Sequence, residues 1–172
     1  MHELTYASRR KDLHLASDSY LRLVPASVAD AIVAATAAAR RAFAVACANL
    51  AVDHCARAVL GLDDGADMTL SQLRDHAIAA TEAREIEGID RLLGRREDHL
   101  YTQLCALRSD DGDAPYNEFI RLACQRHAVR ALRAILATDG VAAAASAAFE
   151  AISVTRNEAD VEALAQRTLP GG

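Results

Sequence analysis

The sequence predicts a single-domain, all-α protein, either a helical bundle or a short αα-repeat of about six helices, spanning residues 1–172. Alanine, the strongest helix former, supplies 39 of the 172 residues. Aromatic residues make up only 4% of the chain, so side chains that favour strands are scarce. Eight glycines and three prolines leave few breaks for turns, which favours long helices joined by few loops.

The first part of the chain predicts two long helical stretches. Residues 4–24 form a helical pattern that ends before Pro25, because a residue that precedes proline avoids the helical backbone conformation. Ser27 is expected to cap the next helix, which continues without glycine or proline until Gly61. A bend near Asn49 would divide this stretch into two helices.

Two shorter helices are expected in the middle of the chain. Thr69 is expected to cap the first, in which leucine and alanine repeat at helical spacing. The following segment, 82–96, is rich in charge, and Gly88 and Gly94 are expected to weaken or stop its helix. Leucines at three-to-four-residue spacing then predict a short helix over residues 100–107.

The last third of the chain predicts three more helices after a polar loop. Residues 109–116 form a strongly polar stretch and a candidate joint between subdomains. Residues 117–138 form an amphipathic helix with arginines along one side. An alanine-rich helix is expected over 142–155, and Asn157 is expected to cap the final one.

Two segments resemble each other and suggest an internal duplication. Residues 54–87 and 127–162 align with small insertions, and in each a helix ends at an Asp-Gly turn before another helix begins. A duplication would produce a pseudo-symmetric bundle or a short α-solenoid. Chance similarity between alanine-rich helices is the alternative.

Charge and composition exclude several classes of partner. The net charge of −5 gives no positive field for nucleic acid or anionic lipid, so we expect neither a nucleic-acid nor a membrane partner. The most apolar stretch, 42–62, carries charges that a bilayer would penalise. Residues 1–24 lack the apolar run of a secretory signal, and so we expect a cytoplasmic protein.

The cysteines and histidines predict no metal site and no cofactor. All four cysteines lie in helical patterns beside apolar neighbours, and no two have C-x-x-C spacing, so we expect buried free thiols. Cys124 and His127 have a spacing that suits two ligands on one helix. No Glu-x-x-His pair accompanies them, however, and a zinc site needs four converging ligands.

One string suggests catalysis. The sequence from Arg121 to His127, RLACQRH, is similar to the R-x4-6-H signature of the HEPN superfamily, small all-α proteins of which many are dimeric ribonucleases. The resemblance implies that Arg121 and His127 meet across a dimer at the scissile phosphate, where a cation stabilises charge beside a general acid or base. It covers seven residues, and Leu122 stands where the family usually has a polar residue. A packed His127 is the alternative.

The remaining templates for catalysis are missing, so the sequence favours a protein without enzymatic activity. It contains no G-x-S-x-G, no P-loop and no G-x-G-x-x-G motif. Its helices carry more apolar surface than a small bundle easily buries. We therefore expect a module that binds another protein, as an adaptor or as an inhibitor of the immunity type, and we also consider a homodimer. The alternative is a metal-independent HEPN-like ribonuclease that acts as a dimer through Arg121 and His127.

Overall fold

The computed structural model describes residues 17–58, 68–109, 116–137 and 140–169, and within these ranges it is all-α, as predicted. No strand occurs in the described ranges, which contain eight helices. They are α2 (Ser17–Leu21), α3 (Ala26–Ala34), α4 (Ala37–Ala58), α5 (Leu70–Ala79), α6 (Ala83–Ser109), α7 (Tyr116–Ala134), α8 (Gly140–Thr155) and α9 (Glu158–Thr168). Most of the helix predicted over residues 4–24 lies outside the described residues.

Helix α8 lies at the centre of the bundle. It packs on α4 and α7 and also contacts α2, α3 and α9. The buried residues of α8 are almost all alanine, whose small side chains let neighbouring helices approach closely on several sides. They are Ala143, Ala144, Ala145, Ala147, Ala148 and Ala151, together with Val154 and Glu150. The alanine content thus determines how tightly the helices pack.

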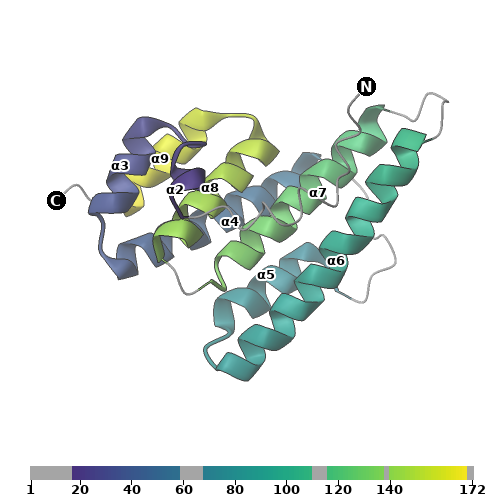
Figure 1. Cartoon of the computed structure of the whole chain (residues 1–172), viewed down its shortest axis with the longest axis horizontal. Helices are drawn as coiled ribbons and strands as arrows, with labels where there is room; N and C mark the ends of the chain where they lie inside the picture. The colour runs from purple at the N-terminus through teal and green to yellow at the C-terminus, as the bar shows by residue number, and fades with distance from the viewer. Residues whose placement is uncertain (1–16, 59–67, 110–115, 138–139, 170–172) are drawn as a thin grey trace.

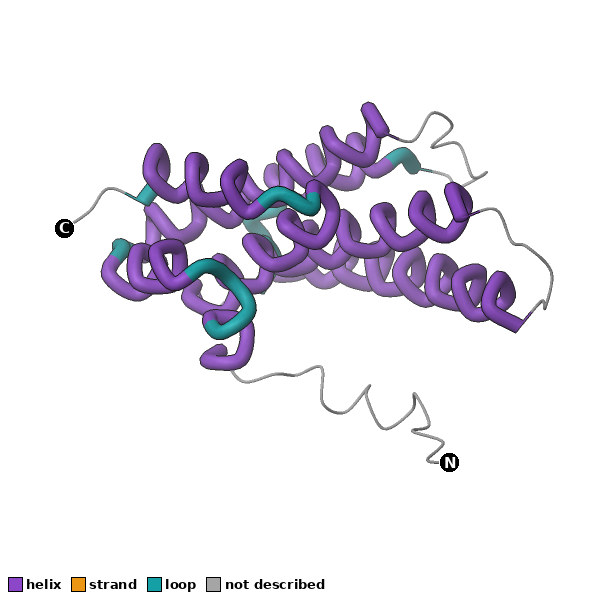
Figure 2. Tube along the Cα trace, turned by 90° about the horizontal axis from the view of Figure 1, so that it is seen from above, coloured by secondary structure: helices purple, strands orange, loops and turns teal. Residues whose placement is uncertain are grey.

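The other helices surround this centre in two groups. Helices α2, α3 and α9 gather at one end of the molecule, and α5 and α6 lie at the opposite side (Figure 1). Helix α6 packs along α7, and α5 contacts α4, α6 and α7. Viewed from above, the helices form an elongated bundle (Figure 2). No helix in the described part of the chain is long and apolar enough to span a membrane.

The long helix predicted from Ser27 is broken, but not near Asn49. The break lies at residues 35–36, where Ala35 has an extended backbone and the Thr36 hydroxyl accepts a hydrogen bond from the Ala39 amide. Arg40 then donates to the backbone carbonyls of Ile32 and Val33 at 2.7 Å. These bonds satisfy carbonyls that the end of α3 leaves without helical partners, and so they stabilise the break.

The helix caps were predicted correctly in two of three places. Thr69 and Gln72 form a capping box, and the Asn157 side chain accepts a hydrogen bond from the Ala159 amide. The prediction for Ser27 was wrong, because α3 begins one residue earlier and Pro25 precedes it. The Ser27 hydroxyl instead donates to Glu162 of α9 at 3.0 Å. This bond ties α3 to α9.

The stop predicted at Gly88 or Gly94 does not occur. Both glycines lie inside α6, which continues through the predicted short helix at 100–107 as one element of 27 residues. A β-carbon at either glycine would meet no atom within 4 Å. The helix persists because its inner face, including Leu93 and Leu100, is fully buried and outweighs the low helix propensity of glycine.

Two other predictions have mixed outcomes. Cys47, Cys55 and Cys124 are buried, as predicted, but Cys105 is exposed because it lies on the outer side of α6. Residues 110–115 of the predicted subdomain joint lie outside the described residues. The internal duplication stays a prediction, since the turn of its first copy falls within 59–67, also outside the described part.

Candidate functional site

Seven charged or titratable side chains form a continuous network along α6, α7 and α8, which we call the charged ladder. Helix α7 supplies four of them, and it runs between the other two helices. The members are Asp90 and Glu97 of α6, Arg126, His127, Arg130 and Arg133 of α7, and Glu150 of α8. Three acids face three arginines, so the charges balance when His127 is neutral.

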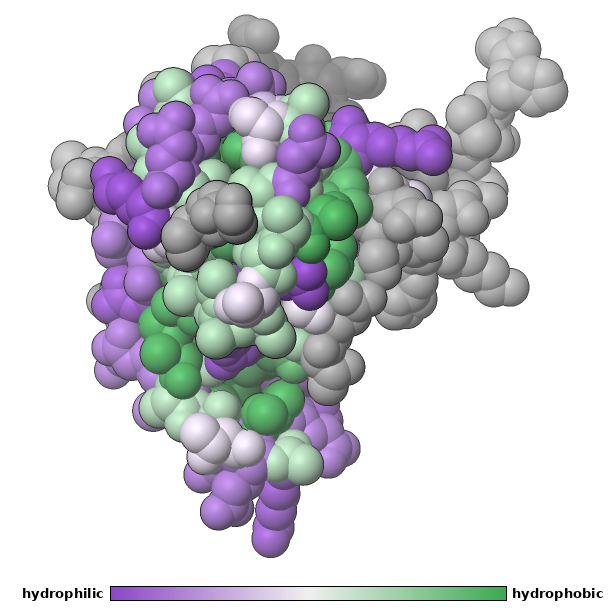
Figure 3. Space-filling model, turned by 90° about the vertical axis from the view of Figure 1, so that its left-hand side faces the viewer, coloured by the Kyte–Doolittle hydropathy of each residue, from purple (hydrophilic) through white to green (hydrophobic). Residues whose placement is uncertain are grey.

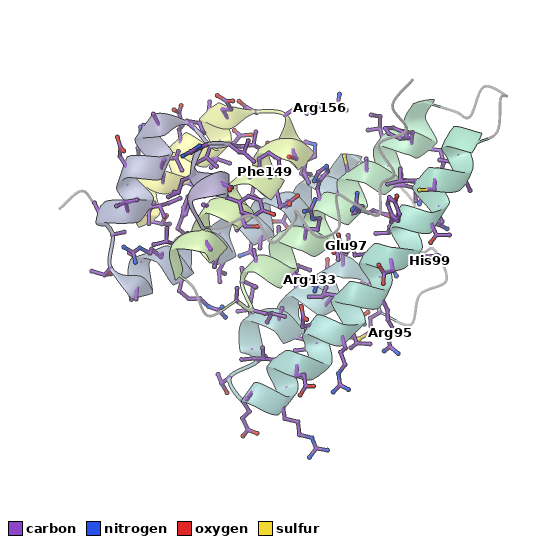
Figure 4. All side chains as sticks on the ribbon, viewed as in Figure 1. Arg95, Glu97, His99, Arg133, Phe149 and Arg156 are labelled. Atoms are coloured by element: carbon purple, nitrogen blue, oxygen red, sulfur yellow. The ribbon has the colours of Figure 1, made fainter. Side chains whose placement is uncertain are left out.

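The outer end of the ladder joins α6 to α7. Arg133 Nε lies 2.9 Å from Asp90 Oδ1, and its Nη1 lies 2.9 Å from Glu97 Oε2. Both Arg133 and Glu97 project into the space between the two helices (Figure 4). These hydrogen bonds raise the pKa of Arg133, chiefly through the bond to Asp90. Arg133 therefore fixes the register of α6 along α7.

Glu97 is the hub of the ladder. Besides its contact with Arg133, the Glu97 carboxylate lies 3.5 Å from Arg126 Nη2 and 3.5 Å from Arg130 Nε. The Arg126 guanidinium also lies over the ring of Tyr101, 5.0 Å from its centre. Three arginine partners and an exposure of only 17% hold the Glu97 side chain in one position.

The inner end of the ladder is a buried carboxylate bonded to a histidine. Glu150 is fully buried, and its Oε2 lies 2.6 Å from His127 Nδ1. Its other oxygen lies 3.3 Å from Arg130 Nε, within ion-pair distance but without hydrogen-bond geometry. An ionised Glu150 makes Nδ1 the donor, which leaves Nε2 of a neutral His127 as a proton acceptor. The His127 side chain is 30% exposed.

Arg121 and His127, the pair singled out in the sequence, take partners on different elements. The Arg121 guanidinium donates to Glu118, one turn earlier on α7. This hydrogen bond lowers the pKa of Glu118. His127 is held by α8 instead. On one continuous helix, the Arg121 and His127 side chains, six residues apart, also point in directions that differ by about 120°.

One buried polar group escaped the sequence reasoning. Gln125 is fully buried on α7, and neither polar atom of its amide has a hydrogen-bond partner among the residues that the structure describes. A buried amide without partners costs about 1–3 kcal/mol. No sequence signal marks this position, because glutamine usually lies on the exposed side of an amphipathic helix.

A second candidate site is a set of exposed apolar residues that runs from the turn before α3, along α3, into the first turns of α4. Leu23 is 47% exposed and Val33 is 56% exposed, the two highest values among the large aliphatic side chains of the described residues. Exposed alanines continue from α3 across the break into α4. We call this set the α3–α4 surface: Leu23, Ala26, Val33, Ala34, Ala37, Ala38 and Ala42. The end of the molecule that carries α3 shows apolar residues across its middle, flanked by hydrophilic ones (Figure 3).

Charged side chains of both signs accompany the α3–α4 surface. Asp30 lies one turn before Val33 on α3, and Arg41 lies in the second turn of α4. Arg22 lies beside Leu23 at the outer end of the surface. All three are exposed, and the described part of the chain offers none of them an ion-pair partner.

The buried cysteines are unreactive in character and do not gather with other ligands. Burial raises the pKa of the Cys55 thiol to about 12, with a further contribution from nearby Cys124. The pKa of Cys47 is also raised by burial. Within the described ranges, no three His, Cys, Asp or Glu side chains lie where they could hold one metal ion.

Comparisons with protein-family models, with curated proteins and with solved structures find no match to this chain. The features of this chain that bear on its function are therefore the charged ladder and the α3–α4 surface.

Proposed function

We propose that this chain is a non-enzymatic, cytoplasmic interaction module, an adaptor or an inhibitor, that binds another protein through the α3–α4 surface. The observation that carries the proposal is the grouping of Leu23 and Val33 with five exposed alanines on one end of the bundle. A contiguous exposed apolar patch with polar surroundings is typical of a protein-binding surface. A single exposed aliphatic side chain would carry no such meaning.

The chemistry of the surface defines the partner. Alanines on α3 and α4 project little, so an apolar helix of a partner can approach their backbones closely. Val33 and Leu23 supply the larger side chains that a partner would enclose. Because Asp30 lies between Ala26 and Val33 and Arg41 lies just before Ala42, the matching surface should carry both signs of charge. Nucleic acid and anionic membranes, which carry one sign only, do not meet this condition.

The charged ladder favours a protein partner over a phosphate-bearing one, because its arginines already pair with acids within the chain. Its arginines face acids of the same chain, and Glu97 alone has three of them as partners. Guanidinium groups engaged in this way hold α6 and α7 together. Phosphate recognition would require their displacement from Glu97 and Asp90.

Capture of partners from a host lysate tests the proposal. The full chain would carry an affinity tag, and three forms would be compared: wild type, Val33→Glu, and Leu92→Glu as the matched control. Leu92 is 38% exposed on α6, distant in sequence from the α3–α4 surface. We expect wild type and Leu92→Glu to retain the same protein partner and Val33→Glu to lose it. Equal capture by all three forms, or capture by none, would contradict the proposal.

The second candidate function, a metal-independent ribonuclease that uses Arg121 and His127, is favoured by one observation. Glu150 orients the His127 ring through Nδ1, which is how a buried carboxylate prepares the other ring nitrogen for proton transfer. Purified protein would be incubated with total RNA in metal-free buffer. Cleavage that His127→Ala and Arg121→Ala both abolish would support this candidate. Intact RNA would reject it.

A further inference from the structure

We propose that the break between α3 and α4 is a hinge that Arg40 holds bent, and that release of Arg40 joins the two helices into one straight helix. The proposal goes beyond the proposed function, because it concerns a change of shape within the chain alone. Figure 1 shows the two helices meeting at an angle. Two backbone carbonyls at this angle can serve either shape, and Arg40 decides between them.

The sequence at the break favours a continuous helix. Five of the six residues from 34 to 39 are alanine, the strongest helix former, and neither glycine nor proline lies between Pro25 and Gly61. Ala35 nevertheless has an extended backbone, with φ −74° and ψ 158°. Local preference alone would continue the helix, so contacts with other parts of the chain bend it here.

Arg40 bonds to the carbonyls that a continuous helix would use. In such a helix, the carbonyls of Ile32 and Val33 would accept hydrogen bonds from the amides of residues 36 and 37. Here they accept from Arg40 Nε and Nη2, each at 2.7 Å. The Thr36 hydroxyl likewise accepts from the Ala39 amide, which a continuous helix would pair with residue 35. The bent and straight shapes therefore satisfy the same backbone groups in two different ways.

Packing adds to the Arg40 bonds in favour of the bent shape. Val28 and Ile32 are buried in the core, and α3 contacts α8 and α9. The Arg40 side chain also lies beside the first residue of α8, because a β-carbon on Gly140 would be 3.7 Å from Arg40 Cδ. Arg40 thus lies where α3, α4 and α8 meet. The straight shape would withdraw α3 from α8 and α9.

The hinge would control the shape of the α3–α4 surface. Val33 and Ala34 belong to α3, whereas Ala37, Ala38 and Ala42 belong to α4. Straightening would turn these two groups relative to each other, so a partner that contacts both would bind only the bent chain. This consequence rests on the proposed function, whereas the hinge itself does not.

The distance between two spin labels in the full chain tests the proposal. The labels would replace Asp30 of α3 and Asp53 of α4, both exposed, in a Cys105→Ser background whose other native cysteines are buried. A straight helix places the two Cα atoms about 35 Å apart, and any bend shortens this distance. We expect the wild type to show only the shorter distance.

Removing the Arg40 bonds should populate the straight shape. Arg40→Met should raise the ratio of straight to bent chains about tenfold or more, because two hydrogen bonds from a charged group are lost. Adding Ile32→Ala should raise the ratio about thirtyfold again, since it weakens the packing of α3 and introduces a strong helix former. If this double variant fails to fold, Ile32→Val replaces Ile32→Ala and should give a smaller shift in the same direction. Arg41→Met, at the next and exposed position, is the matched control and should leave the distance unchanged.

A proline variant distinguishes straightening from a loosening of α3. Ala37→Pro suits the first position of α4 in the bent chain, but it removes the amide that would bond to Val33 in a straight helix. It should therefore abolish the long distance in Arg40→Met/Ile32→Ala.

Three results would overturn the proposal. They are a spread of shorter distances alone in Arg40→Met/Ile32→Ala, a long distance that persists with Ala37→Pro, and equal effects of Arg40→Met and Arg41→Met. The measurement involves no partner, so its outcome is separate from that of the lysate capture.

Discussion

Replacing the buried Glu150 with glutamine tests the energetic role of the charged ladder. Glutamine keeps the shape of the side chain and removes its charge, so His127 and Arg130 lose their shared carboxylate. Removing one partner of a buried ion pair costs about 3–5 kcal/mol. Arg130 retains Glu97 at 3.5 Å, so we expect the lower end, about 3 kcal/mol.

Urea denaturation followed by circular dichroism at 222 nm measures this loss. For a chain of 172 residues, about 3 kcal/mol corresponds to a decrease in melting temperature of about 6–12 °C. Glu118→Gln is the matched control, because that glutamate pairs with Arg121 at the surface and should contribute no more than about 1 kcal/mol. Adding His127→Ala to Glu150→Gln should cost less than His127→Ala alone. The reasoning is refuted if Glu150→Gln and Glu118→Gln destabilise the protein equally.

Three further predictions concern single side chains. Gln125→Met should raise the free energy of unfolding by about 1 kcal/mol, because it removes a buried amide without partners, and a loss of stability would show that the amide is satisfied. Gly94→Ala should add about 0.5–1 kcal/mol in the same urea assay, since its β-carbon meets no atom within 4 Å, and a decrease would reveal a hidden contact. Iodoacetamide at pH 8, followed by peptide mass spectrometry, should modify the exposed Cys105 first. Cys47 and Cys55 should resist until the protein unfolds, because burial raises the pKa of both thiols and leaves almost no thiolate, so equal rates would contradict their placement.

The sequence predicted the fold class because local signals determine it. Alanine content, the scarcity of aromatic residues and the caps at Thr69 and Asn157 act within a few residues of each helix. The break at Thr36 was missed, since neither glycine nor proline marks it. It depends on Arg40 reaching back to carbonyls of α3, an interaction between two helices that periodicity does not report.

The candidate sites were less predictable, because they depend on which helices become neighbours. His127 was singled out from the sequence, but its partner Glu150 lies 23 residues away on α8, within an alanine-rich helix. The arginines of α7 were expected on a polar face, and the acids that pair with Arg126, Arg130 and Arg133 lie on α6 and α8. Excess apolar surface was predicted in general terms. Its location at Val33 emerged only from the packing of α3.

Site-specific photo-crosslinking tests the central claim, that the α3–α4 surface binds protein, most directly. A photoreactive phenylalanine would replace Val33 in one form of the chain and Leu92 in another, and both forms would be irradiated in host cells. We predict covalent protein adducts from position 33 and none from position 92. Adducts absent from position 33, or equally abundant at both positions, would contradict the claim.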